Sequence, residues 1–163
     1  MKALLTWRGH AYLALLARLY LGVVFILACL HKIASPATFA LDVATYQFLP
    51  LSLINIFALI MPMLELLAGV MIVVGLRTRA AALLIAAMML AFMIALGWAL
   101  SLGLEMSCGC FASQGGAHYP ISGWTMLRDA GWLVLALYVL VFDRAPLGLD
   151  RLLGPGDHPQ PTR

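Results

Sequence analysis

Four long apolar segments constrain the fold of this 163-residue chain more than any other feature of its sequence. They cover about residues 11–33, 51–76, 80–104 and 124–142. A hydrocarbon core of roughly 30 Å requires about 20 apolar residues of helix, and each segment is long enough. A backbone in lipid must satisfy its own hydrogen bonds, so each segment should be helical. We therefore predict an all-α protein, a four-helix transmembrane bundle formed by residues 1–142.

The composition agrees with a membrane protein. Hydrophobic residues make up 64% of the chain and charged residues only 10%, which is too few to cover a soluble domain of this length. The lipid bilayer is therefore an expected partner, and nucleic acid is not. Residues 143–163 contain several prolines, so we predict a short disordered tail there. The expected location is the inner membrane of a bacterial cell, with several crossings.

The distribution of basic residues predicts the orientation of the bundle. Only Lys32 and Arg128 fall on the side of residues 34–50 and 105–123. The other side contains the chain start, the turn between the second and third segments, and the tail, with Lys2, Arg8, Arg77, Arg79, Arg144, Arg151 and Arg163. Basic residues favour the cytoplasm, so both termini should be cytoplasmic and residues 34–50 and 105–123 should face the periplasm.

A cysteine pair stands in one of the few polar stretches, "SCGCFASQGG" at residues 107–116. Cys108 and Cys110 are separated only by Gly109, which permits the bend that a disulfide between them requires. So small a ring departs from relaxed disulfide geometry and constrains little chain entropy. Both properties favour an easily reduced redox pair over a structural disulfide. Zinc prefers four Cys or His ligands, so no metal site is predicted.

The first apolar segment has one polar face. On a helical wheel, Arg18, Cys29 and Lys32 lie close together, so this face should point into the bundle. Cys29 is either a third redox cysteine, near the end of the helix where the cysteine pair follows, or a small buried hydrophobe. The letters "ILAC" also resemble a lipoprotein cleavage box ending at Cys29, but Leu27 is bulky for that motif, so an uncleaved helix is expected.

The second apolar segment contains Glu65 within "MPMLELLAG". A bare carboxylate is costly there, so Glu65 should be neutral, paired with a residue such as Arg18, or facing a wet cavity. A structural ion pair is slightly favoured over proton handling or contact with a quinone head group. Arg128 and Asp129 are interpreted as interfacial residues. Five aromatic residues are interpreted as interface anchors: Phe39, Tyr46, Phe48, Trp124 and Trp132.

Five stretches of the sequence follow one another in the order seen in a known family. They are "ARLYLGVVFILACLHKIASPATFA", "YQFLP", "MPMLELLAGVMIVVGLRTRAAA", "CGCF" and "ISGWTMLRDAGWL". Over roughly residues 17–140 the chain resembles the MauE group of methylamine-utilisation membrane proteins, within the DoxX-like family. Ala112 stands where the family motif usually continues with glycine. By position, Cys108 and Cys110 match the family's cysteine pair, and four residues match its charged positions: Arg18, Lys32, Glu65 and Arg128.

The resemblance implies a membrane protein of periplasmic redox maturation. Such a protein would act with a thioredoxin-like partner while disulfides form in the small subunit of methylamine dehydrogenase. The leading hypothesis is a membrane thiol–disulfide oxidoreductase in which Cys108 and Cys110, with Cys29, exchange electrons. Quinone is the candidate cofactor, and the four charged residues are its candidate contacts. The alternatives are a non-catalytic scaffold of a maturation complex and, less favoured, a transporter of small solutes or metal ions.

Overall fold

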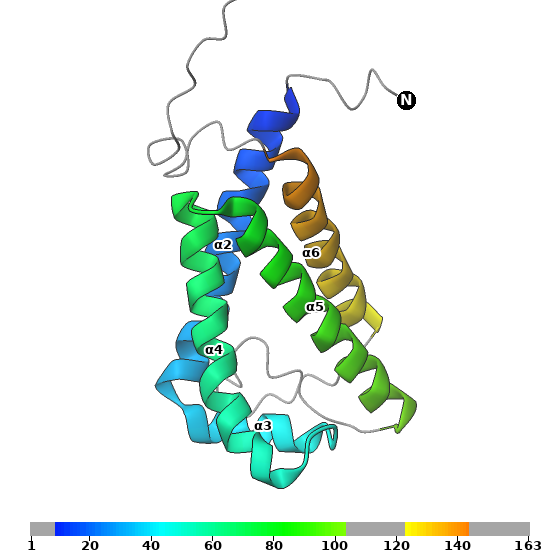
Figure 1. Cartoon of the computed structure of the whole chain (residues 1–163). Helices are drawn as coiled ribbons and strands as arrows, with labels where there is room; N and C mark the ends of the chain where they lie inside the picture. Colours follow the sequence, from blue (N-terminus) through cyan, green and yellow to red (C-terminus); the bar gives the residue numbers. More distant parts are fainter. Residues whose placement is uncertain (1–8, 104–122, 144–163) are drawn as a thin grey trace, which may run out of the picture.

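A computed structural model describes residues 9–103 and 123–143 of the chain. These two stretches form helices and contain no strand. The helices are α2 (Gly9–Ala34), α3 (Pro36–Thr45), α4 (Leu51–Val74), α5 (Thr78–Ser101) and α6 (Gly123–Phe142) (Figure 1). The elements α2, α4, α5 and α6 correspond to the four apolar segments, and their ends differ from the predicted ends by three residues at most.

These four helices are long and apolar enough to cross a membrane. Their candidate spans are Tyr12–Ala34, Leu51–Val74, Thr78–Ser101 and Trp124–Phe142. Large hydrophobic side chains are exposed along their outer faces, among them Leu16, Leu59 and Leu83. Such faces are stable in contact with lipid. The all-α, four-helix transmembrane prediction is therefore confirmed, while the orientation of the termini stays a prediction and the tail at residues 144–163 lies outside the described residues.

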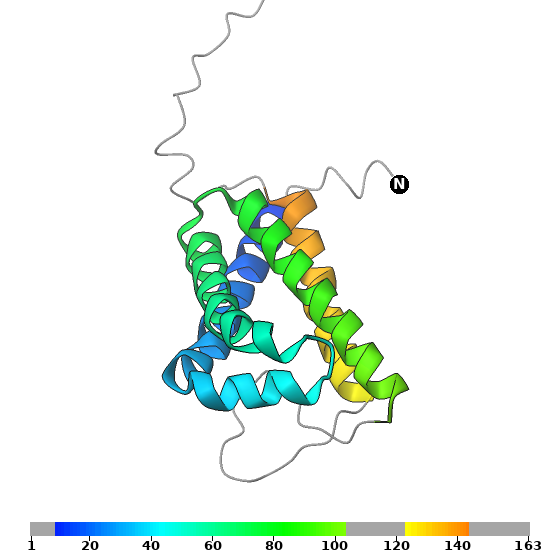
Figure 2. The same cartoon turned by 60° about the horizontal axis from the view of Figure 1, so that its bottom comes forward.

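The connection between α2 and α4 contains a helix that the sequence analysis did not anticipate. Helix α3 begins with Pro36 in its first turn, where a missing N–H costs nothing. After α3, Gln47 has a positive φ of 50°, and Pro50 precedes α4 in an extended conformation. This turn returns the chain so that α3 lies along the first half of α4 (Figures 1 and 2).

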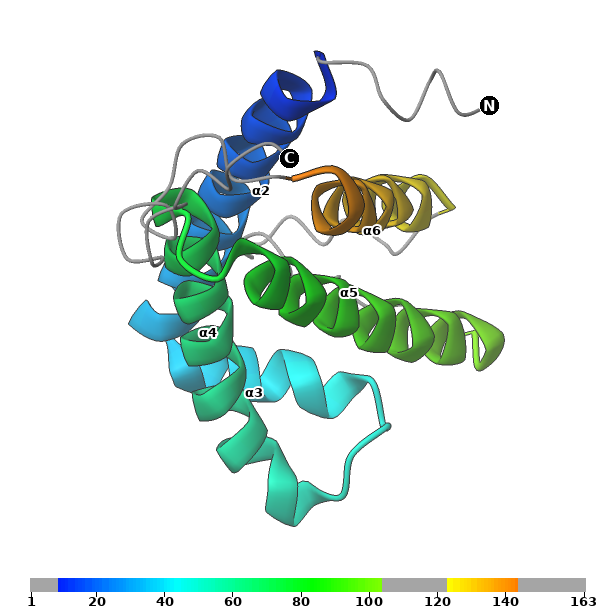
Figure 3. The same ribbon diagram turned by 45° about the horizontal axis from the view of Figure 1, so that its top comes forward.

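The helices form two groups. Helix α2 packs most extensively on α4, and α5 packs on α6, with smaller contacts joining α2 to α6 and α4 to α5. Figure 3 shows α2, α3 and α4 on one side and α5 and α6 on the other. The shared core lies where the groups meet, and its largest fully buried members are Leu21, Ile72, Ile85 and Val139.

Two glycines allow α2 and α4 to approach closely. A Cβ atom added at Gly22 would collide with the side chain of Val73 and lie 3.0 Å from the carbonyl oxygen of Gly69. A Cβ atom added at Gly69 would lie 3.2 Å from the carbonyl oxygen of Gly22. Small residues at such crossings let membrane helices gain van der Waals contact. Gly22 and Gly69 therefore set the distance between α2 and α4 at this point.

Candidate functional site in a cavity between the two helix groups

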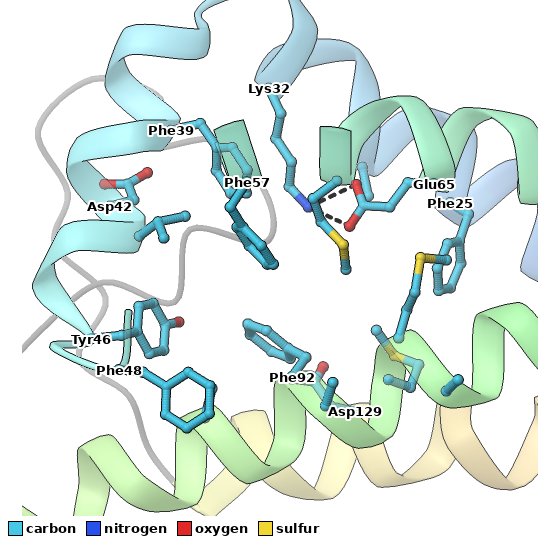
Figure 4. A pocket seen from close by; sticks show the side chains of 18 of the residues that line it. Phe25, Lys32, Phe39, Asp42, Tyr46, Phe48, Phe57, Glu65, Phe92 and Asp129 are labelled. Carbon is cyan, nitrogen blue, oxygen red and sulfur yellow. Dashed lines mark hydrogen bonds and ion pairs between the residues drawn. The ribbon is translucent and has the colours of Figure 1, made fainter. Parts of the chain in front are cut away.

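A cavity of about 370 Å³ lies between the two helix groups, at the end of the bundle where α3 lies (Figure 4). All five described helices contribute to its lining. We call it the aromatic cavity because six aromatic side chains other than tyrosine form much of its wall: Phe25, Phe39, Phe48, Phe57, Phe92 and Trp132. Three methionines, Met61, Met88 and Met89, add further apolar surface.

One wall of the aromatic cavity carries a buried ion pair. Lys32 of α2 donates from Nζ to both carboxylate oxygens of Glu65 in α4, at 2.7 and 2.9 Å. Each residue is only 6% exposed, and the ammonium also lies 5.1 Å from the centre of the Phe39 ring. Of the alternatives given for Glu65, the structure shows the ion pair, and the partner is Lys32 and not Arg18.

Arg18 lies elsewhere. It is buried, and its Nη1 lies 3.5 Å from Oδ2 of Asp143, which follows the end of α6. Arg18 precedes Lys32 by 14 residues, roughly 21 Å along a helix, and it does not line the aromatic cavity. The structure therefore separates Arg18 from Lys32 and Glu65. The polar face of α2 nevertheless points inward as predicted, since Arg18, Cys29 and Lys32 are all buried.

The facing wall carries a second buried carboxyl group, on Asp129 of α6 (Figure 4). Asp129 is 1% exposed and faces the interior of the bundle, which its interpretation as an interfacial residue did not anticipate. Its Oδ1 accepts a hydrogen bond from Nε of Arg128 at 3.1 Å. Its Oδ2 is buried and has no hydrogen-bond partner within residues 9–103 and 123–143. The signal was present in the sequence, because Asp129 precedes the buried Ala136 and Val139 at helical spacing.

Arg128 and the aromatic residues take different positions. The guanidinium of Arg128 lies over the ring of Trp132, 4.7 Å from its centre, and its side chain is 36% exposed. Arg128 therefore approaches the cavity through Asp129 and Trp132 and is not itself part of the lining. Tyr46 is buried and lines the cavity, which a lipid-facing anchor would not do, whereas Trp124 is exposed.

The cysteines divide between described and undescribed parts of the chain. Cys29 is fully buried, its Sγ donates to the carbonyl oxygen of Ile26 at 3.1 Å, and it does not line the cavity. Cys108 and Cys110 lie outside the described residues. The end of α5 and the start of α6, which flank them in sequence, lie at the end of the bundle that holds α3 (Figure 1). The redox roles of all three cysteines stay predictions.

Comparison with known proteins identifies the family. The family model of the methylamine utilisation protein MauE matches residues 10–142, which include nearly all of the helical residues described above. The chain belongs to the MauE family. A curated relative, the methylamine utilization protein MauE of Paracoccus denitrificans, is 31% identical over 123 residues. The match covers 75% of this chain and 65% of the relative, slightly under two thirds of its length. No solved structure matches this MauE-family chain.

Proposed function

We propose that this MauE-family protein is a membrane thiol–disulfide oxidoreductase that forms disulfides in a periplasmic partner. The observation that carries the proposal is the position of the cysteine pair in the chain. Cys108 follows Gly103, the last described residue after α5, by five residues, a span of at most roughly 18 Å. The aromatic cavity, with its buried charged groups, lies at the same end of the bundle. Thiols and a cavity with buried charged groups at one end would suit electron exchange between a protein partner and the membrane.

The proposed reaction begins with a Cys108–Cys110 disulfide. A thiolate of a thioredoxin-like partner attacks one of its sulfurs, which breaks that bond and forms a mixed disulfide. The second partner thiol then attacks the mixed disulfide, so the partner leaves oxidised and two thiols remain on this chain. Two electrons and two protons have been transferred. A membrane quinone accepts both pairs and becomes hydroquinone, and the Cys108–Cys110 disulfide forms again.

The biological setting is carried over from the family. The curated relative is named for methylamine utilization. We infer that the final substrate here is an enzyme of methylamine utilisation whose disulfides must form outside the cytoplasm, as in the maturation of methylamine dehydrogenase. The proposal includes an inner-membrane location with the cysteine pair on the periplasmic side. An impermeant maleimide applied to intact cells should label Cys108 and Cys110 after reduction.

The decisive experiment follows the thiol state of the cysteines in membranes. Proteins are trapped with a mass-tagged alkylating reagent, with the quinone pool either oxidised or reduced, and the intact mass is measured. We expect a Cys108–Cys110 disulfide that becomes a dithiol when the pool is reduced, and loss of partner oxidation in Cys108→Ser and Cys110→Ser. Cys29→Ser in the same assay shows whether the third cysteine also takes part. A thiol state that ignores the quinone pool, with partner oxidation intact in both serine variants, would favour a scaffold instead.

A further inference from the structure

We propose that the aromatic cavity binds the head group of a quinone, between Lys32 on one wall and Asp129 on the facing wall. The inference rests on the proposed function, in which a quinone is the electron acceptor. It goes further by assigning the binding site and the two residues that recognise the ligand. The site lies between helices that belong to different groups of the bundle, so a bound ring would contact both groups (Figure 4).

Lys32 supplies the first polar contact. An ammonium has three N–H donors, and Glu65 accepts two of them. In the part of the chain that the structure describes, no third acceptor is bonded to Nζ. A quinone carbonyl oxygen is such an acceptor, and its hydrogen bond to a charged donor would be stronger than one between neutral groups. Glu65 neutralises the ammonium of Lys32. The pair therefore has no net charge, which suits a neutral ligand.

Asp129 supplies the second polar contact. Its Oδ2 is buried beside the cavity without a partner among residues 9–103 and 123–143, and a buried polar atom left in that state destabilises the fold unless a ligand supplies the hydrogen bond. A hydroquinone hydroxyl can donate to a carboxylate oxygen, and a protonated carboxyl can donate to a quinone carbonyl. Asp129 can therefore bind both redox states of the ligand. Its carboxylate accepts a hydrogen bond from the hydroquinone, and its protonated form donates one to the quinone.

The remaining walls match a flat ring. Aromatic side chains prefer offset or edge contacts with other π systems, and methionine adapts to irregular apolar surfaces. The volume of about 370 Å³ falls within the range of roughly 300–1,000 Å³ for small-molecule sites. A lipid acyl chain would fit the apolar walls but would leave Lys32 and Asp129 without a match. A soluble anion would face the carboxylates of Glu65 and Asp129 as like charges.

The edge of the cavity on α5 gives the apolar tail of a quinone a way out. Ala87 and Ala91 line the cavity one helical turn apart, and both are exposed. They lie in the candidate membrane span Thr78–Ser101, so in the proposed site this edge would open toward the lipid. Because alanine side chains are small, the opening is not covered by the lining itself. The polar head group can then remain inside while its tail stays in the bilayer.

Trp132 in the lining provides a direct assay. Decylubiquinone is titrated into nanodiscs that contain the full chain with Cys108→Ser and Cys110→Ser, so that no cysteine-pair chemistry contributes. Trp7, Trp98 and Trp124 are replaced by phenylalanine, which leaves Trp132 as the fluorophore. The matched control keeps Trp98, which is exposed on α5 outside the cavity, and replaces Trp132. We expect saturable quenching of Trp132 and only linear quenching of Trp98.

Variants then locate the site. Ala28→Phe, which places a ring in the lining, should raise the half-saturating quinone concentration at least tenfold, whereas Ala80→Phe on an exposed position of α5 should not. Asp129→Leu should weaken quinone binding by a similar factor, and it provides the test if Ala28→Phe fails to fold. Equal linear quenching of both tryptophans, or saturable quenching unaffected by the lining variants, would overturn the inference. Saturable binding combined with a cysteine pair that ignores the quinone pool would instead refute the proposed function and leave the site intact.

Discussion

The buried pair of Lys32 and Glu65 makes a quantitative prediction about folding. Removing one partner of a buried ion pair leaves an uncompensated charge and typically costs about 3–5 kcal/mol, whereas replacing both partners by apolar residues is often neutral or stabilising. Both side chains here are at least nine-tenths buried, and the contact is bidentate at 2.7 and 2.9 Å. We therefore expect Lys32→Met to lower the free energy of unfolding by an amount in this range. The free energy of unfolding of Lys32→Met/Glu65→Leu should lie within about 1 kcal/mol of that of the original protein.

The positions of the two residues also predict an asymmetry between the single variants. Lys32 lies two residues before the end of α2, so a released ammonium can extend toward the membrane interface. Glu65 lies nine residues before the end of α4, roughly 14 Å inside the helix, and its side chain is shorter. Glu65→Leu should therefore destabilise less than Lys32→Met, by at least about 1 kcal/mol, because only the lysine left behind can reach water.

Unfolding in mixed micelles tests both statements. Each variant is titrated with sodium dodecyl sulfate in a mild detergent, and helix content is followed by circular dichroism to obtain the change in unfolding free energy. The four proteins form a double-mutant cycle, in which the coupling energy should be several kcal/mol. A double variant as unstable as Lys32→Met, or a Glu65→Leu variant that is the less stable of the two, would refute the reasoning. The folded double variant should also have lost saturable quinone binding.

Three further predictions concern other parts of the bundle. Gly22→Ala should lower the free energy of unfolding by about 1–3 kcal/mol because the added methyl group meets α4. Gly97→Ala is the control and should be neutral, since there is open space around Gly97. Equal effects of the two variants in the same titration would contradict this prediction. Asp143→Ala should lower the free energy of unfolding by about 1.5–3 kcal/mol, less than Lys32→Met, because the contact between Arg18 and Asp143 is longer, at 3.5 Å, than the bidentate contact between Lys32 and Glu65. Cys29 should react with maleimide only after denaturation, since its side chain is fully buried, and rapid labelling of the folded protein would show that the site opens.

The four-helix fold could be predicted because lipid leaves few alternatives. Apolar length alone located α2, α4, α5 and α6, and the helical wheel placed Cys29 and Lys32 on the inward face of α2. A wheel gives the direction of a side chain but not its depth against a neighbouring helix. For this reason the sequence indicated that Glu65 needs a partner but did not distinguish Lys32 from Arg18.

The cavity and α3 were harder to predict, for different reasons. The cavity depends on the packing of two helix groups, a tertiary property that no local pattern in the sequence encodes. Helix α3 had a recognisable start signal in Ser35 followed by Pro36, but residues 34–50 were considered only for the side of the membrane that they face. Asp129 was assigned to the interface because it lies near the start of the fourth apolar segment, although its spacing to Val139 indicates the buried face of α6.

The close approach of Gly22 and Gly69 has a consequence at a distance. Lys32 follows Gly22 by ten residues, so the α2 segment between them is a lever arm of roughly 15 Å. A tilt of about 5° at the glycine contact would move the backbone at Lys32 by roughly 1.3 Å on this arm, which is enough to break or remake a hydrogen bond. A larger side chain at the glycine contact should therefore change the width of a cavity that neither glycine touches. Related chains could adjust their ligand preference from this contact while keeping the whole lining unchanged.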